Sequence, residues 1–146
     1  MIISAATAAD LEQILVLEES GFDLPQRWSR DAWQAELDNA DRLVLVRRDD
    51  SGSVVGVASF SLAADLADLL RVIVASESRG RGLGSSLIRA GMEWAKAVGA
   101  DRMLLEVRPD NTPAVRTYQK LGFATLDRRR DYYGIGVDAL VMAVRL

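Results

Sequence analysis

Residues 79–84 read Arg79-Gly80-Arg81-Gly82-Leu83-Gly84, between an apolar run at residues 69–74 and a helical pattern that begins near Ser85. A strand, a glycine-rich turn and a helix N-terminus, in that order, form an anion site. Glycine lets the backbone come close to the anion, and the first N–H groups of the helix point toward it. Because Arg79 and Arg81 add positive charge, the sequence predicts a phosphate-bearing ligand. The alternative is a glycine-rich surface turn with incidental arginines.

The spacing of the glycines shows which type of phosphate-binding loop this stretch resembles. A P-loop ends in Gly-Lys-Ser/Thr and a dinucleotide loop reads Gly-x-Gly-x-x-Gly, and this stretch matches neither pattern. It does contain Arg-x-x-Gly-x-Gly, formed by Arg79, Gly82 and Gly84. This pattern resembles the acetyl-CoA pyrophosphate loop of the GNAT superfamily of N-acyltransferases. The resemblance implies that acetyl-CoA is the co-substrate and that residues 79–85 bind it.

Length and composition narrow the class of protein. A chain of 146 residues with 49% hydrophobic and 27% charged residues predicts one globular domain, residues 1–146. The net charge of −3 argues against a nucleic-acid partner. The sequence contains neither cysteine nor histidine, which excludes thiolate nucleophiles and histidine triads, and we expect no metal site. We find no signal-peptide pattern and no apolar stretch of membrane length, so we expect a cytoplasmic protein without a membrane partner.

Hydrophobic periodicity and capping residues predict the order of the secondary-structure elements. Helices are expected after the caps Thr7 and Ser29, over residues 85–98, and after the cap Thr112. Turns or loops are expected at residues 22–28, 49–52, 128–130 and 134–136. Strands are expected at residues 2–5, 43–46, 54–62, 69–74, 103–107, 124–126 and 139–144.

This order, β-α-α-β-β-β-α-β-α-β-β, predicts an α/β protein with a mixed sheet. A helix separates the fourth and fifth strands, so a right-handed parallel crossover is expected there, whereas the other strands follow as hairpins. The order resembles the GNAT fold over the whole chain. The resemblance implies that the fourth and fifth strands splay apart and that the pantetheine arm of the co-substrate fills the opening.

A second block of sequence also resembles the GNAT superfamily, in its strand-then-helix signature. The block comprises Leu104-Leu105-Glu106-Val107-Arg108, then Asn111, then Ala114-Val115-Arg116-Thr117-Tyr118-Gln119-Lys120-Leu121-Gly122-Phe123. Three segments are similar to the RimI-like ribosomal-protein alanine N-acetyltransferases within this superfamily. They are residues 105–108, residues 129–133 with 138–142, and Leu24-Pro25 with Trp28-Ser29. In the last segment Gln26-Arg27 separates Pro25 from Trp28 and Leu24 replaces an aromatic residue, and this departure bears on peptide specificity.

The resemblance implies a role for two catalytic residues. Glu106 would be the general base, directly or through water, and Tyr118 would donate a proton to the departing CoA thiolate. A base is needed because a protonated amine has no lone pair. An α-amine with a pKa of about 8 is more easily deprotonated at neutral pH than a lysine amine with a pKa of about 10.4. The alternatives are that Glu106 is an exposed partner of Arg102 or Arg108 and that Tyr118 only packs against neighbouring side chains.

The resemblance also assigns residues to the co-substrate and to the acceptor. Asn111 would bond the pantetheine or pyrophosphate, unless it is only a turn or cap residue. Backbone N–H groups of Val72, Ile73 and Val74 would polarise the thioester carbonyl. Four side chains would contact the acceptor peptide, unless the tyrosines only cover the sheet: Leu24, Trp28, Tyr132 and Tyr133. Trp33, on an apolar helix face, is expected in the core.

Together these features predict an enzyme that transfers an acetyl group from acetyl-CoA to the N-terminal α-amine of a protein, with a ribosomal protein among the expected acceptors. Direct attack in a ternary complex is expected, because no cysteine is present to hold an acyl intermediate. One alternative is a GNAT enzyme that acetylates lysine side chains or a small amine. Another is an acyl-CoA-binding module without turnover.

Overall fold

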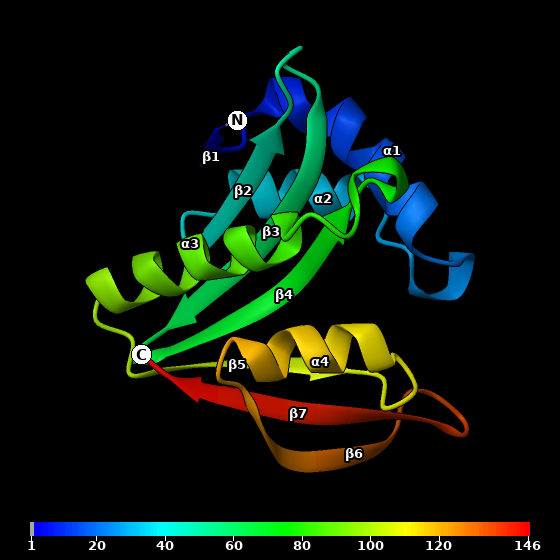
Figure 1. Ribbon diagram of the computed structural model, residues 1–146, viewed down its shortest axis with the longest axis vertical. Helices are drawn as coiled ribbons and strands as arrows, with labels where there is room; N and C mark the ends of the chain where they lie inside the picture. Colours follow the sequence, from blue (N-terminus) through cyan, green and yellow to red (C-terminus); the bar gives the residue numbers. More distant parts are fainter. Residues whose placement is uncertain (1) are drawn as a thin grey trace. The chain divides into compact units, whose positions relative to one another are not determined.

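The computed structural model describes residues 2–146 (Figure 1). The strands are β1 (Ile3–Ala5), β2 (Arg42–Arg48), β3 (Val54–Ala63), β4 (Leu66–Val74), β5 (Arg102–Val107), β6 (Ala124–Gly134) and β7 (Val137–Arg145). The α-helices are α1 (Leu11–Gly21), α2 (Arg30–Asp38), α3 (Leu83–Ala97) and α4 (Thr112–Lys120). Short 3₁₀ turns are η1 (Ala8–Asp10), η2 (Leu24–Gln26) and η3 (Ser76–Ser78). No helix within residues 2–146 has both the length and the apolar character needed to cross a bilayer.

The strands form a seven-stranded mixed sheet in the order β1-β2-β3-β4-β5-β7-β6. β4 and β5 are parallel, whereas the pairs β1–β2, β2–β3, β5–β7 and β6–β7 are antiparallel. This confirms the predicted element order, the mixed sheet and the parallel relation across α3.

The chain forms two compact units. Unit 1 comprises the chain up to Ser61 together with Leu69–Gly91, and unit 2 comprises Leu62–Asp68 and Met92–Leu146. The parallel pairing of β4 with β5 lies in unit 2 and joins Leu66–Asp68 to residues 102–104. Divergence of the two strands beyond this register stays a prediction. Because β4 and α3 each contribute residues to both units, the single domain expected from the length stays a prediction.

In unit 1, β3 is buried along most of its length because helices cover both of its faces. In Figure 1, α3 crosses in front of this strand and α2 lies behind it. On the α2 side, the Oγ of Ser59 donates to Glu36 at 3.0 Å. On the α3 side, the fully buried ring of Phe60 lies against Gly91. The period-2 alternation of a strand therefore distributes successive β3 residues between two helical layers.

Two predicted helix starts are confirmed by their hydrogen bonds. The backbone N–H of Thr7 donates to the Asp10 carboxylate at 2.9 Å, although the first turn there is the 3₁₀ turn η1 and α1 follows it. The Oγ of Ser29 accepts from the N–H of Ala32 at 3.1 Å at the start of α2. Trp33, one residue further, is fully buried as expected.

The cap of α4 was predicted wrongly. Asn111, and not Thr112, is the N-cap, and its Oδ1 accepts from the N–H of Ala114 at 3.4 Å. Both side chains can cap a helix, and Pro113 is suited to the start of a helix next to either of them. α3 likewise begins at Leu83, two residues before the predicted start.

The C-terminal hairpin is longer than predicted. Residues 128–130 were expected in a solvated loop, but they belong to β6, which runs from Ala124 to Gly134. Nearly every β6 residue is exposed, so the apolar alternation of a half-buried strand is missing. Pairing with β7 holds this segment extended, and such pairing depends on residues distant in the sequence.

We expect Gly91→Ala to destabilise the protein, although alanine is the better helix former by about 1 kcal/mol. An added Cβ would lie 2.1 Å from the nearest ring atom of buried Phe60, and overpacking of this kind costs about 1–3 kcal/mol. Urea denaturation should show a lower free energy of unfolding. Gly84→Ala is the matched control, because its Cβ would lie 3.6 Å from Val74. Equal stability of Gly91→Ala and the wild type would contradict this description of the interface.

Candidate active site

The glycine-rich turn leads into α3 with the geometry of an anion site. Gly80 and Gly82 have φ values of 80° and 74°, a region that glycine adopts without a steric penalty. The carbonyl of Gly82 accepts from the N–H of Ser86 at 3.0 Å. The N–H groups of residues 83–85 therefore precede the first hydrogen bond of the helix and are available at its positive end.

Two arginines support this turn, and one of them was not predicted. The Nε of Arg79 donates to the carbonyl of Val74 at 3.0 Å, which ties the turn to the end of β4. Arg47 of β2 donates to the Oγ of Ser86, so its positive charge lies within the first turn of α3. No local signal marks Arg47, because it is 39 residues away from Ser86. The turn, the helix end and both charges lie in unit 1 and fit a pyrophosphate group.

The segment between α1 and α2 carries the two predicted acceptor contacts of unit 1. Leu24, at the start of η2, has 76% of its surface exposed. Trp28 is half-buried and lies against Trp33, with 4.9 Å between the ring centroids. Arg27, one of the two extra residues noted in the sequence, donates from its Nε to the carbonyl of Phe22 at 3.1 Å. The extra residues are therefore hydrogen-bonded into the segment and do not form a loose insertion.

Glu106 occupies the more exposed face of β5 in unit 2. Met103, Leu105 and Val107 are buried, whereas Glu106 between them is half-buried. The alternative was an exposed ion pair of Glu106 with Arg102 or Arg108, and Arg108 pairs instead with Asp110 at 3.0 Å. The alternation of side chains along a strand places Glu106 on this face.

Strand register brings two further charged residues onto the same face as Glu106. Asp68 of β4 is in register with Leu104, two residues before Glu106. Glu106 is in register with Val141 of β7, and Arg129 of β6 with Ala139. Burial raises the pKa of Glu106, the negative charge of Asp68 raises it further, and Arg129 opposes both effects. A carboxylate with a raised pKa is a stronger base than an ordinary glutamate.

The two predicted tyrosines lie in an irregular part of β6. The register between β6 and β7 shifts between Arg129 and Gly134, and Asp131 has a φ of 55°. The Asp138 carboxylate accepts from the N–H of Asp131 at 3.1 Å and so holds the irregular backbone in place. That N–H and the Arg128 guanidinium hold the pKa of Asp138 below its usual range. A bulge of this kind redirects side chains, here those of Tyr132 and Tyr133.

Tyr132 belongs to the electrostatic environment of Glu106. Burial raises the pKa of Tyr132, and the Glu106 charge raises it further. Arg129 acts in the opposite direction, and its guanidinium lies 5.7 Å from the ring centroid of Tyr132. The rings of Tyr132 and Tyr133 meet edge to face, with 4.9 Å between their centroids. Tyr132 therefore lies close enough to Glu106 for the charge of Glu106 to act on it, and a shared acceptor site stays a prediction.

Tyr118 is buried on α4, with 9% of its surface exposed. Its ring lies edge-on to Phe123, with a centroid separation of 6.0 Å. Burial raises the pKa of Tyr118 to about 12. Its phenol therefore keeps its proton at neutral pH and can act as a hydrogen-bond donor.

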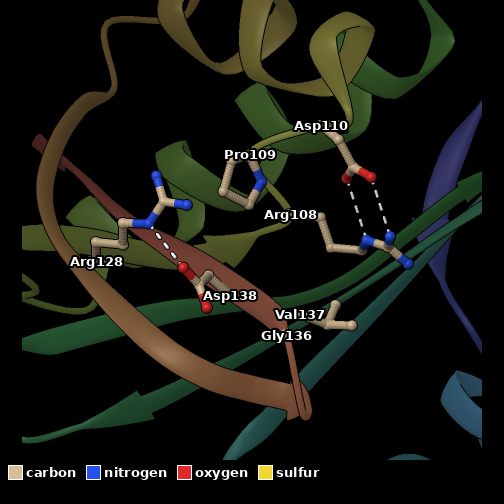
Figure 2. A pocket seen from close by; sticks show the side chains of 7 residues that line it. All are labelled: Arg108, Pro109, Asp110, Arg128, Gly136, Val137 and Asp138. Atoms are coloured by element: carbon tan, nitrogen blue, oxygen red, sulfur yellow. Dashed lines mark hydrogen bonds and ion pairs between the residues drawn. The ribbon is translucent and has the colours of Figure 1, made fainter.

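A cavity of about 180 Å³ in unit 2 lies beside the C-terminal hairpin (Figure 2). Its seven lining residues include two ion pairs, Arg108 with Asp110 and Arg128 with Asp138. None of the seven is a residue expected to bind acetyl-CoA or the acceptor, so we assign this cavity no part in the reaction. Among residues 2–146, no group of acidic side chains is arranged to hold a metal ion.

The predicted site residues are divided between the two units. Unit 1 contains Leu24, Trp28, residues 72–74 and residues 79–85, whereas unit 2 contains Glu106, Asn111, Tyr118, Tyr132 and Tyr133. A groove formed by both sets stays a prediction. Asn111 caps α4, which agrees with the alternative given for it, and its contact with the co-substrate also stays a prediction.

Comparison with known proteins finds a family and several full-length relatives. The sequence model of the acetyltransferase (GNAT) family matches residues 9–123. A Bacillus subtilis (strain 168) protein, provisionally named ribosomal protein bS18 alanine N-acetyltransferase, is 34% identical over 94% of this chain and 90% of its own. The Mycobacterium tuberculosis protein named N-alpha-acetyltransferase RimI is 30% identical over 96% of this chain and 89% of its own.

A solved structure shows the same fold. The crystal structure of the ribosomal-protein-S18-alanine N-acetyltransferase from Escherichia coli matches with a TM-score of 0.89 and 25% sequence identity. The match covers 99% of this chain and 92% of that one. The element order and the strand order described above are therefore those of a known acetyltransferase structure.

We expect Asp68→Asn to lower the pKa of Glu106 and Arg129→Gln to raise it. The Asp68 charge disfavours ionisation of Glu106 and the Arg129 charge favours it, so removing each charge should move the pKa of Glu106 in the opposite direction. NMR titration of the Glu106 side-chain carboxyl would measure both shifts. Asp110→Asn is the control, because Asp110 pairs with Arg108. Shifts of the same sign in both variants would contradict the arrangement.

Proposed function

The chain belongs to the GNAT acetyltransferase family, and we propose that it transfers the acetyl group of acetyl-CoA to the N-terminal α-amine of a protein. One observation supports the choice of acceptor, which family membership alone does not specify. Glu106, a half-buried carboxylate with a raised pKa, shares its environment with Tyr132 of the hairpin. Two relatives that match nearly the whole chain carry names that describe N-terminal or alanine N-acetylation.

The residues of unit 1 fit the diphosphate of acetyl-CoA. The positive φ of Gly82 and the unbonded first turn of α3 suit an anion. Arg47 and Arg79 add charge at the same place. When bound, acetyl-CoA supplies an activated thioester. Backbone N–H groups of residues 72–74 would stabilise the negative charge that develops on its carbonyl oxygen.

Glu106 would remove the proton of the acceptor ammonium, so that the nitrogen lone pair can attack the thioester carbonyl. The gap in pKa between a carboxyl group near 4.3 and an α-ammonium near 8 is several units. The raised pKa of Glu106 narrows that gap. A lysine ammonium at about 10.4 leaves a much wider gap, which favours an N-terminal acceptor over a lysine side chain.

Tyr118 would stabilise the departing thiolate by donating a hydrogen bond. Its pKa of about 12 exceeds that of an ordinary thiol, near 8.5. Complete transfer of the phenol proton to the thiolate is therefore uphill, whereas a hydrogen bond carries no such cost. Glu106 takes the first proton of the ammonium group before attack. As the C–N bond forms and the C–S bond breaks, the nitrogen gives up a second proton, which balances the charge of the departing CoA thiolate, and no acyl-enzyme is formed.

A panel of acceptors tests this function. We expect peptides that begin with Ala or Ser to be acetylated with a kcat/KM at least about tenfold above that of an N-terminally blocked peptide with an internal lysine, a difference of about 1.4 kcal/mol. The extra residues Gln26-Arg27 make another small amine the second candidate. Faster acetylation of a polyamine than of any N-terminal peptide would support that candidate and overturn the N-terminal assignment. Binding of acetyl-CoA without turnover would indicate a binding module.

We expect Glu106→Gln to lower kcat by about 10²–10⁴-fold, the range for a single positioned base, and to leave acetyl-CoA affinity nearly unchanged. The defect should shrink as pH rises, because the free amine then forms without a base. Steady-state kinetics between neutral and alkaline pH, with calorimetry for acetyl-CoA, would measure both effects. Glu12→Gln, on the exposed surface of α1, is the control. Full activity of Glu106→Gln at neutral pH would show that another group is the base.

A further inference from the structure

A buried ion pair lies beneath the segment between α1 and α2. Glu18 of α1 and Arg71 of β4 are 53 residues apart in sequence, and their side chains are 1% and 10% exposed. The Nε of Arg71 donates to one carboxylate oxygen of Glu18 at 3.2 Å, and its Nη2 donates to the other. The guanidinium and carboxylate therefore meet through two parallel hydrogen bonds, the most specific geometry available to this pair.

Arg71 also contacts the segment itself at three places. Its guanidinium lies 3.4 Å from the ring centroid of Phe22 and 4.9 Å from that of Trp28. It also donates a hydrogen bond to the carbonyl of Gln26. One planar cation thus joins the beginning, the middle and the end of residues 22–28.

Glu18 also bonds to the end of the same segment. Its carboxylate accepts from the backbone N–H of Trp28 at 3.2 Å and from the Nε1 of Trp33 at 2.9 Å. Every bond that this carboxylate makes therefore goes to the segment, to α2 or to Arg71. Such a fully bonded, buried charge permits few alternative positions for its partners.

The extra residues of this chain complete the arrangement. Gln26 supplies the carbonyl that Arg71 bonds. Arg27 donates to the carbonyls of Phe22 and Glu19, at the end of α1. Gln26 and Arg27, the two residues that separate Pro25 from Trp28, are thus the ones that these hydrogen bonds hold in place.

From this arrangement we propose that Glu18 and Arg71 are positioning residues that hold residues 22–28 in the conformation that receives the acceptor. The inference rests on the proposed acetyl transfer. Arg71 directly precedes Val72–Val74, so the strand that would face the thioester also anchors the acceptor segment. Leu24 is exposed on this segment, whose aromatic residues Phe22 and Trp28 contact the Arg71 guanidinium. Lysine cannot replace Arg71, because it has neither the fork nor the plane that stacks on the two rings.

The first experiment compares Arg71→Lys with the wild type. This variant keeps the buried positive charge and so leaves Glu18 with a partner. We expect faster amide hydrogen exchange in residues 22–28 and a rise of about tenfold or more in the acceptor KM. The KM for acetyl-CoA should stay within about twofold. Unchanged exchange in residues 22–28 would overturn the inference.

The second experiment separates positioning from stability. Glu18→Gln with Arg71→Met removes both buried charges and keeps a carbonyl for Trp33, and such neutral replacements often restore stability. The matched control is Glu12→Gln with Arg30→Met, which makes the same changes in an exposed pair that joins α1 to α2. We expect the buried double variant to keep its raised acceptor KM even where its melting temperature equals that of the control. A wild-type acceptor KM would show that the pair serves stability alone.

The acceptor in both experiments is the amine that the wild type acetylates fastest in the panel. If that amine is not an N-terminal peptide, the N-terminal assignment fails. The positioning inference is still decided, because it concerns the ratio between the acceptor KM and the acetyl-CoA KM. A defect confined to the acetyl-CoA KM would overturn it.

Discussion

The buried pair of Glu18 and Arg71 is the constraint on which the packing of residues 22–28 in unit 1 depends. A charge removed from water must be paired and fully hydrogen-bonded, and loss of one partner costs about 3–5 kcal/mol. The chain meets this requirement by bringing α1, η2, α2 and β4 to one point. A buried ion pair adds little net stability compared with apolar residues, so its value here lies in defining a single arrangement of these elements.

The same physical effect, loss of contact with water, acts on the chemistry in unit 2. Burial raises the pKa of Glu106 and the pKa of Tyr118. The two shifts have different chemical consequences. A raised pKa makes the carboxylate a stronger base, whereas it makes the phenol keep its proton. The proposed base and hydrogen-bond donor thus differ in role because of their own chemistry and not because their environments differ in kind. The charge of Asp68 raises the pKa of Glu106 further, and the charge of Arg129 lowers it.

The sequence predicted the fold where the signal was local. The caps at Thr7 and Ser29, the turn at residues 49–52 and the apolar periods each depend on residues within one or two turns. The errors have a common cause as well. Asn111 and Thr112 are both capable caps, and only the path of the backbone selects one. Residues 128–130 lack apolar alternation, and pairing with β7 makes them a strand.

The sequence by itself determined the class of protein and the order of elements, and it predicted the residues that carry the chemistry. Hydrophobic periodicity and capping residues were sufficient for the order of elements, and two separated motifs with the absence of cysteine and histidine were sufficient for the rest. Only the tertiary structure decided the surroundings of those residues. Arg47 reaches Ser86, Arg71 reaches Glu18, and Asp68 acts on Glu106 because the chain folds distant segments together. Charge and burial act through space, so the pKa of a base and the rigidity of a loop depend on neighbours that no local pattern identifies.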